Sequence, residues 1–132
     1  MNLLKYVVSV GLLAFAVALG LNPAYGRTIQ IDPDDCATLA GSVFVMTKYI
    51  RDSYPPIEQI ELIVNNLKHD SGINISDPVK YLVINLSFTF HNLVSNPIIR
   101  ERIRDQWLAD AADRIFNYCI VENGQFTFPD GN

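Results

Sequence analysis

The sequence predicts an all-α domain, a four-helix antiparallel bundle closed by one disulfide. Four stretches after residue 26 are candidate helices, and the first, second and fourth repeat apolar residues at steps of three and four, the spacing of a helix with one buried face. Three of them begin with an acidic or amide side chain followed by proline, a pair that starts a helix well. The only two cysteines, Cys36 and Cys119, lie at the start of the first stretch and the end of the last. Because an up-down-up-down bundle brings these positions to the same end, the spacing fits a disulfide across that end.

Residues 1–26 have the layout of a secretory signal peptide. Lys5 precedes an apolar run from Val7 to Leu21, and small residues follow at positions 24 and 26. Cleavage is expected after Gly26, with Gly20 as a second possible site. The alternative is an uncleaved membrane anchor, but the run is shorter than the roughly 20 residues that a spanning helix needs. The sequence therefore predicts a periplasmic or secreted protein that is free of the membrane after cleavage. In such an oxidising compartment a disulfide is favoured over the alternative of two free thiols.

The charge balance disfavours two classes of partner. The chain has 10 basic and 14 acidic residues, for a net charge of −4. Residues 1–26 hold one base and no acid, so cleavage would leave nine bases against 14 acids and a net charge of −5. Nucleic acid and anionic lipid surfaces both favour basic patches, so neither is expected as a partner.

The first helix is expected from Asp32 to Tyr54. Asp32 would cap it, and two more acids would lie in the first turn, where the helix dipole favours negative charge. The helix should end at the Pro55-Pro56 pair, because proline disfavours helical backbone in the residue before it. The second helix is expected from Pro56 to Gly72. Its buried face would consist of Ile57, Ile60, Val64 and Leu67.

The third element, residues 79–94, allows two interpretations. Asp77-Pro78 has the form of a helix start. From Ile84 to His91, however, apolar and polar residues alternate, which is typical of a strand. The chain has no second strand candidate of this length with which such a strand could pair. We therefore favour a buried helix and keep the strand as the alternative.

The fourth helix is expected to run without a break from Asn96 to Cys119. Its apolar face would consist of Ile99, Ile103, Trp107, Ala111 and Ile115. Mixed charges cover the other side at helical spacing, as on a solvated surface. Gly124 would end the helical region. The predicted organisation is thus a signal peptide (1–26), a helical domain (27–124) and a flexible C-terminal tail (125–132).

No catalytic, cofactor-binding or metal-binding set is predicted. The chain has two histidines, His69 and His91, and lacks the HExxH, CxxC and glycine-rich phosphate-loop patterns. The adjacent residues His69, Asp70 and Ser71 cannot reach one another in the geometry of a catalytic triad. Acidic neighbours of Cys36 disfavour a reactive thiolate. We therefore expect a non-enzymatic protein that needs neither cofactor nor metal.

Short motifs near both ends of the domain carry a resemblance. Cys36 and Ala40 form a Cys-x-x-x-Ala motif, Arg51-Asp52 follows near the end of that helix, and the closing stretch reads ADRIFNYC. In these motifs the chain resembles a group of small exported proteobacterial helical proteins with one cysteine near each end of the domain. In size, compartment and helicity it is also similar to HdeA-like periplasmic acid chaperones and to Tai-type periplasmic immunity proteins.

Two functions are expected from these features. The first is binding of another periplasmic protein, as an inhibitor or immunity protein does. The candidate contact residues are the aromatic residues Phe88, Phe90 and Trp107. The alternative is an acid-stress chaperone, which would expose the segment from Val83 to Phe90 when acid protonates the carboxylates.

Overall fold

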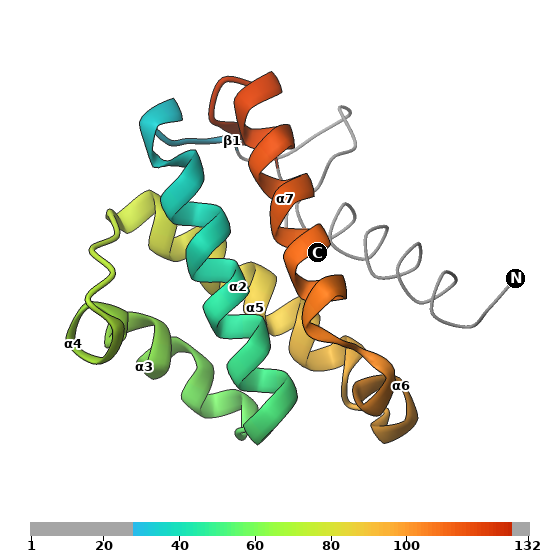
Figure 1. Ribbon diagram of the computed structural model, residues 1–132. Helices are drawn as coiled ribbons and strands as arrows, with labels where there is room; N and C mark the ends of the chain where they lie inside the picture. The colour runs from blue at the N-terminus through green and yellow to red at the C-terminus, as the bar shows by residue number, and fades with distance from the viewer. Residues whose placement is uncertain (1–27, 128–132) are drawn as a thin grey trace, which may run out of the picture.

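The computed structural model describes residues 28–127 (Figure 1). The predicted signal peptide, Arg27 and residues 128–132 of the predicted tail lie outside the described residues. Within residues 28–127, 75% of the positions are helical, and no helix there combines the length and apolarity needed to cross a membrane. The elements are β1 (Thr28–Gln30), η1 (Pro33–Asp35), α2 (Cys36–Ser53), η2 (Ile57–Gln59), α3 (Ile60–Asn65), α4 (Leu67–Ser71), α5 (Asp77–Leu93), α6 (Pro97–Arg102), α7 (Asp105–Val121) and β2 (Gln125–Thr127).

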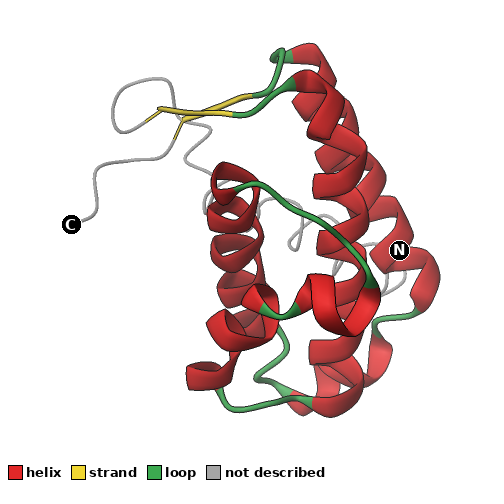
Figure 2. Ribbon diagram, turned by 90° about the vertical axis from the view of Figure 1, so that its left-hand side faces the viewer, coloured by secondary structure: helices red, strands yellow, loops and turns green. Residues whose placement is uncertain are grey.

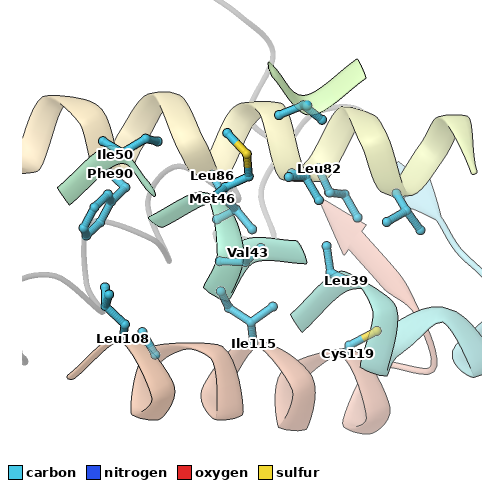
Figure 3. Close-up of a cluster of buried hydrophobic side chains, with 14 of the residues drawn as sticks. Leu39, Val43, Met46, Ile50, Leu82, Leu86, Phe90, Leu108, Ile115 and Cys119 are labelled. Carbon is cyan, nitrogen blue, oxygen red and sulfur yellow. The ribbon is translucent and has the colours of Figure 1, made fainter. Parts of the chain in front are cut away.

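Helix α2 lies at the centre of the fold, with α5 on one side and α7 on the other. Its buried residues recur at steps of three and four, so that α2 contributes side chains to both contacts. Figure 3 shows Leu39, Val43, Met46 and Ile50 of α2 between Leu82, Leu86 and Phe90 of α5 and Leu108, Ile115 and Cys119 of α7. This layer of three helices holds most of the hydrophobic core.

Contacts at the helix ends give the directions of the three long helices. Cys36 at the start of α2 is bonded to Cys119 near the end of α7. Lys48 near the end of α2 contacts Asp105 at the start of α7, so α2 and α7 are antiparallel. The end of α5 lies beside the end of α2, where His91 contacts the carbonyl oxygen of Pro55. Helices α2 and α5 therefore run in the same direction.

The third element is a helix, as we favoured, and the strand interpretation is wrong. Helix α5 begins one residue earlier than expected: the Ser76 hydroxyl accepts a hydrogen bond from the Val79 N–H at 3.5 Å. Its fully buried residues, which include Leu82, Leu86 and Phe90, follow helical spacing. The alternating pattern arose because polar residues such as Asn85 and Thr89 lie at half-buried positions of α5. Their side chains bond to carbonyl oxygens one turn earlier in the same helix.

The four-helix antiparallel bundle is not confirmed, because two of the four expected helices are broken. The second is divided into η2, α3 and α4, and only α3 packs substantially on α5. The fourth is interrupted at Ile103 and Arg104, whose backbones are extended (φ −79°, ψ 118° and φ −101°, ψ 166°). This break separates α6 from α7, and α6 has no buried residue. In Figure 1, α6 lies at the lower right, beyond the end of the three-helix layer.

A two-stranded ribbon stands at the end of the molecule where α2 begins and α7 ends (Figure 2). Strands β1 and β2 are antiparallel, with Ile29 opposite Phe126. Phe126 is fully buried and its ring lies 5.4 Å from that of Tyr118. The expected flexible tail is therefore wrong for residues 125–127, which are paired and anchored. A three-residue strand carries too little periodicity to be recognised, and its partner strand lies almost 100 residues away.

Gly124 is a position where the turn into β2 requires glycine. Its φ is +79°, and a Cβ atom there would collide with the backbone oxygen of Ile31. Because left-handed backbone is strained for other residues, Gly124→Ala is expected to lower the free energy of unfolding by about 2 kcal/mol. Gly41→Ala is the control, since Gly41 lies within α2 with nothing near its Cβ position. That change should instead stabilise the protein by about 0.5–1 kcal/mol. Urea unfolding measures both, and equal effects would contradict the ribbon geometry.

Candidate functional site

The predicted disulfide is present and lies inside the protein. The Sγ atoms of Cys36 and Cys119 are bonded, with their Cα atoms 5.7 Å apart. Both residues are 0% exposed. The bond joins the start of α2 to the end of α7 and leaves no free cysteine in residues 28–127. Its role is structural, because buried sulfurs cannot meet a substrate or a redox partner in solution.

The three aromatic residues predicted to contact a partner are not presented together on the surface. Phe90 and Trp107 are buried in the core, with ring centroids 6.1 Å apart. The prediction is therefore wrong for these two residues in the folded protein. Phe88 is half-buried and packs against the edge of the core. The reason is the period of α5: residues two apart share a face in a strand but point in nearly opposite directions in a helix.

A second cluster, which the sequence did not reveal, lies at the end of α2 opposite the disulfide. Tyr54 ends α2 with left-handed backbone, φ 39° and ψ 62°. Such backbone costs a non-glycine residue on the order of 1–3 kcal/mol, and Pro55 follows directly. A strained residue persists only where the surrounding side chains hold it in place.

Residues from two further segments hold the Tyr54 ring. The His91 ring of α5 stacks on it, with centroids 4.5 Å apart and 14° between the planes. The guanidinium of Arg100 in α6 lies over it, 4.4 Å from the ring centroid, a favourable cation–π arrangement. His91 Nε2 donates to the Pro55 carbonyl oxygen at 2.8 Å, because a carbonyl can only accept. Arg100 Nη1 donates to the Val94 carbonyl oxygen at 2.9 Å. The stack thus ties α6 to the ends of α2 and α5.

An ion-pair network at the same end joins α2 to α7. Asp105 Oδ1 and Oδ2 accept from Arg51 Nη2 and Lys48 Nζ, at 2.6 Å and 3.0 Å. Arg51 also contacts Asp52, and its Nη1 donates to the Ile103 carbonyl oxygen at 3.4 Å. Partial burial alone would lower the pKa of Arg51, but the hydrogen bonds to Asp52 and Asp105 outweigh it and the pKa is raised. The hydrogen bonds from Lys48 and Arg51 lower the pKa of Asp105.

At the break between α6 and α7, the Ile103 carbonyl oxygen has its partner outside its own helix. In a continuous helix the carbonyl oxygen of Ile103 would bond to an amide one turn later. In the extended conformation it accepts from Arg51 instead, while the Ile103 side chain enters the core at 3% exposure. The break separates α6, which carries the exposed residues Ile98 and Arg102, from α7, before whose first residue the exposed Arg104 lies. We call these three residues the elbow surface.

The elbow surface combines an apolar side chain with two unpaired cations. Ile98 is 62% exposed. Arg102 follows it by one helical turn and so lies on the same face. Neither Arg102 nor Arg104 forms an ion pair with any residue in 28–127. Within the same range, no group of three or more His, Cys, Asp and Glu side chains is placed to hold a metal ion. Chemically, the elbow surface presents one aliphatic side chain and two guanidinium groups to solvent.

Replacing Asp105 should change how stability depends on pH. A carboxyl group whose pKa is lowered by folding stabilises the protein above its ordinary value of 3.8, and this contribution disappears as the pH falls through the lowered value. Asp105→Asn should therefore lower the melting temperature at pH 7, and the difference from wild type should shrink towards zero between about pH 5 and pH 2. Asp113→Asn, at an exposed position of α7 without an ion pair to a described residue, controls for the lost charge. A deficit for Asp105→Asn that is independent of pH would contradict the network.

No family model, curated protein or solved structure matches this chain.

Proposed function

We propose that this chain is a non-enzymatic, exported protein that binds another protein, as an inhibitor or immunity protein does. Export rests on the signal-peptide layout of residues 1–26, and the disulfide is consistent with an oxidising compartment outside the cytoplasm. We also propose that a four-helix antiparallel plan underlies the fold, with α3 and α4 as a shortened second helix.

The observation that carries the binding proposal is the exposure of α6. A six-residue helix without a buried residue contributes little to the core, yet it holds Ile98 at 62% exposure, with Arg102 one turn later. Exposed apolar groups that a fold does not need are candidates for recognition. Arginine is enriched in protein interfaces and in the residues that dominate their affinity.

The contacts that hold α6 and the long helices in place support this proposal. The Tyr54 stack holds α6 from one side, and the disulfide fixes the two antiparallel helices at the far end. A surface that is already ordered loses less conformational entropy on binding, which favours tight association.

Affinity capture tests the proposal. The exported protein, immobilised through its C-terminus, is exposed to periplasmic extract of its source organism, and retained proteins are quantified by mass spectrometry. One partner should be retained in amounts close to equimolar, and Ile98→Asp should reduce its recovery. Leu62→Asp is the matched control, because Leu62 lies on α3 with nearly the same exposure, 61%. If no protein is enriched above an empty support, the binding function is wrong.

One observation favours the acid-chaperone alternative. Asp105 ties α2 to α7 through two ion pairs that acid would remove. Val83 and Phe90 are both fully buried, so loosening of this contact would expose the apolar segment that a chaperone needs. Dye binding and the far-UV spectrum followed from pH 7 to about pH 3 test this candidate. Signals that stay unchanged over that range would exclude it.

A further inference from the structure

Acidic and basic residues are distributed unequally between the two ends of this acidic chain. Residues 28–36 and 118–127, at the disulfide end, hold four acids and no base. Residues 48–54 and 97–105, at the opposite end, hold five of the ten bases of the chain against three acids. The two ends are opposite because α2 and α7 are antiparallel. These two segments therefore carry a net charge of +2, which the nearby Glu58 of η2 reduces to +1, although the whole chain has a net charge of −4.

The positive charge available to a partner comes from the elbow surface. Of the three acids in these segments, Asp52 and Asp105 are already paired with Arg51 and Lys48, while Glu101 is exposed on α6. Arg100 is held against the Tyr54 ring. Arg102 and Arg104 are exposed and form no ion pair within residues 28–127. Their guanidinium groups can therefore bond to carboxylates of another molecule without first breaking an internal pair.

We propose that the elbow surface binds an acidic protein partner, with Ile98 in an apolar pocket of that partner and its carboxylates on Arg102 and Arg104. The inference rests on the proposed binding function and names the partner's chemistry. An acidic partner is repelled by the acidic segments at the disulfide end and attracted by Arg102 and Arg104, so charge orients its approach. Nucleic acid and anionic membranes are extended polyanions that would also meet the acidic remainder of the chain, and they favour broad basic surfaces.

A photo-crosslinking experiment tests the surface separately from the function. A benzophenone amino acid replaces Ile98 in one sample and Leu62 in another, and each exported protein is irradiated in periplasmic extract. The expected result is one acidic protein cross-linked from position 98 and not from position 62. Cross-links from position 62 alone would overturn the elbow surface while leaving the binding function intact. If neither position yields a cross-link and capture on a support also fails, the binding function itself is wrong.

The affinity of the purified pair then tests the role of charge. Arg102→Gln with Arg104→Gln should weaken binding about tenfold or more at low salt, as expected for charge pairs across an interface. The difference from wild type should narrow at high salt. Arg114→Gln, at an exposed arginine in the middle of α7, is the matched control and should leave affinity unchanged. The proposal would be overturned if the affinity of the pair changed neither with the double substitution nor with the salt concentration. The proposal would also be overturned if no acidic protein binds and if anionic vesicles or a DNA oligonucleotide bind in a way that requires Arg102 and Arg104.

Discussion

Replacing both cysteines with alanine, Cys36→Ala with Cys119→Ala, is expected to lower the free energy of unfolding by about 4.5 kcal/mol. The bond closes a loop with a sequence separation of 83 residues, and a cross-link of that span removes much of the conformational freedom of the unfolded chain. Since small domains commonly have only about 5–15 kcal/mol in total, the variant should be barely folded at room temperature.

Urea unfolding without reductant measures this change. Wild-type protein that has been unfolded, reduced and refolded in reductant is the control, because it keeps both sulfur atoms but lacks the bond. It should match the double variant to within about 1 kcal/mol, a precision that urea extrapolation allows. A double variant almost as stable as the oxidised wild type would show that the disulfide is not what stabilises the domain.

Phe90→Ala is expected to cost about 3–5 kcal/mol, whereas Phe88→Ala should cost far less. Phe90 is fully buried and its ring lies against that of Trp107. Phe88, two residues earlier, is only half-buried. Removing the first ring leaves a cavity in the core, while the site of the second can fill with solvent.

The fluorescence of Trp107 provides the measurement, since it is the only tryptophan and lies next to the altered position. Urea unfolding followed at its emission should give the two stabilities from one signal. Equal losses for the two variants would contradict the helical arrangement, because a strand would place both rings on the same face.

Local signals in the sequence predicted much of the helical structure. The Asn96 side chain accepts hydrogen bonds from the Ile98 and Ile99 N–H groups at the start of α6, and Pro97 follows it as expected. The Asp32 side chain also caps, although it does so for η1 and α2 begins at Cys36. Such contacts span two or three residues, so the residue types alone are enough to predict them.

Contacts between distant segments could not be predicted in the same way. The break after α6 contains no proline or glycine, and the bond from Arg51 to the Ile103 carbonyl oxygen crosses from α2. The Tyr54 stack likewise joins residues from the ends of α2 and α5 and from α6. The sequence Tyr54-Pro55-Pro56 gives a local signal there, and that signal predicts the end of a helix. The strand-like alternation of residues 84–91 would place Phe88 and Phe90 on one face, whereas the helix buries Phe90 and leaves Phe88 half-buried.

The Cys36–Cys119 bond closes this helical domain and suits it to an oxidising compartment. Intact mass spectrometry after alkylation in denaturant, without reductant, tests it most directly. Unfolding is essential, because both cysteines are 0% exposed and would escape the reagent in the folded protein whether bonded or not. The expected result for the exported chain is a mass lacking two hydrogen atoms, with no alkyl group added. Two alkylated thiols would contradict the account.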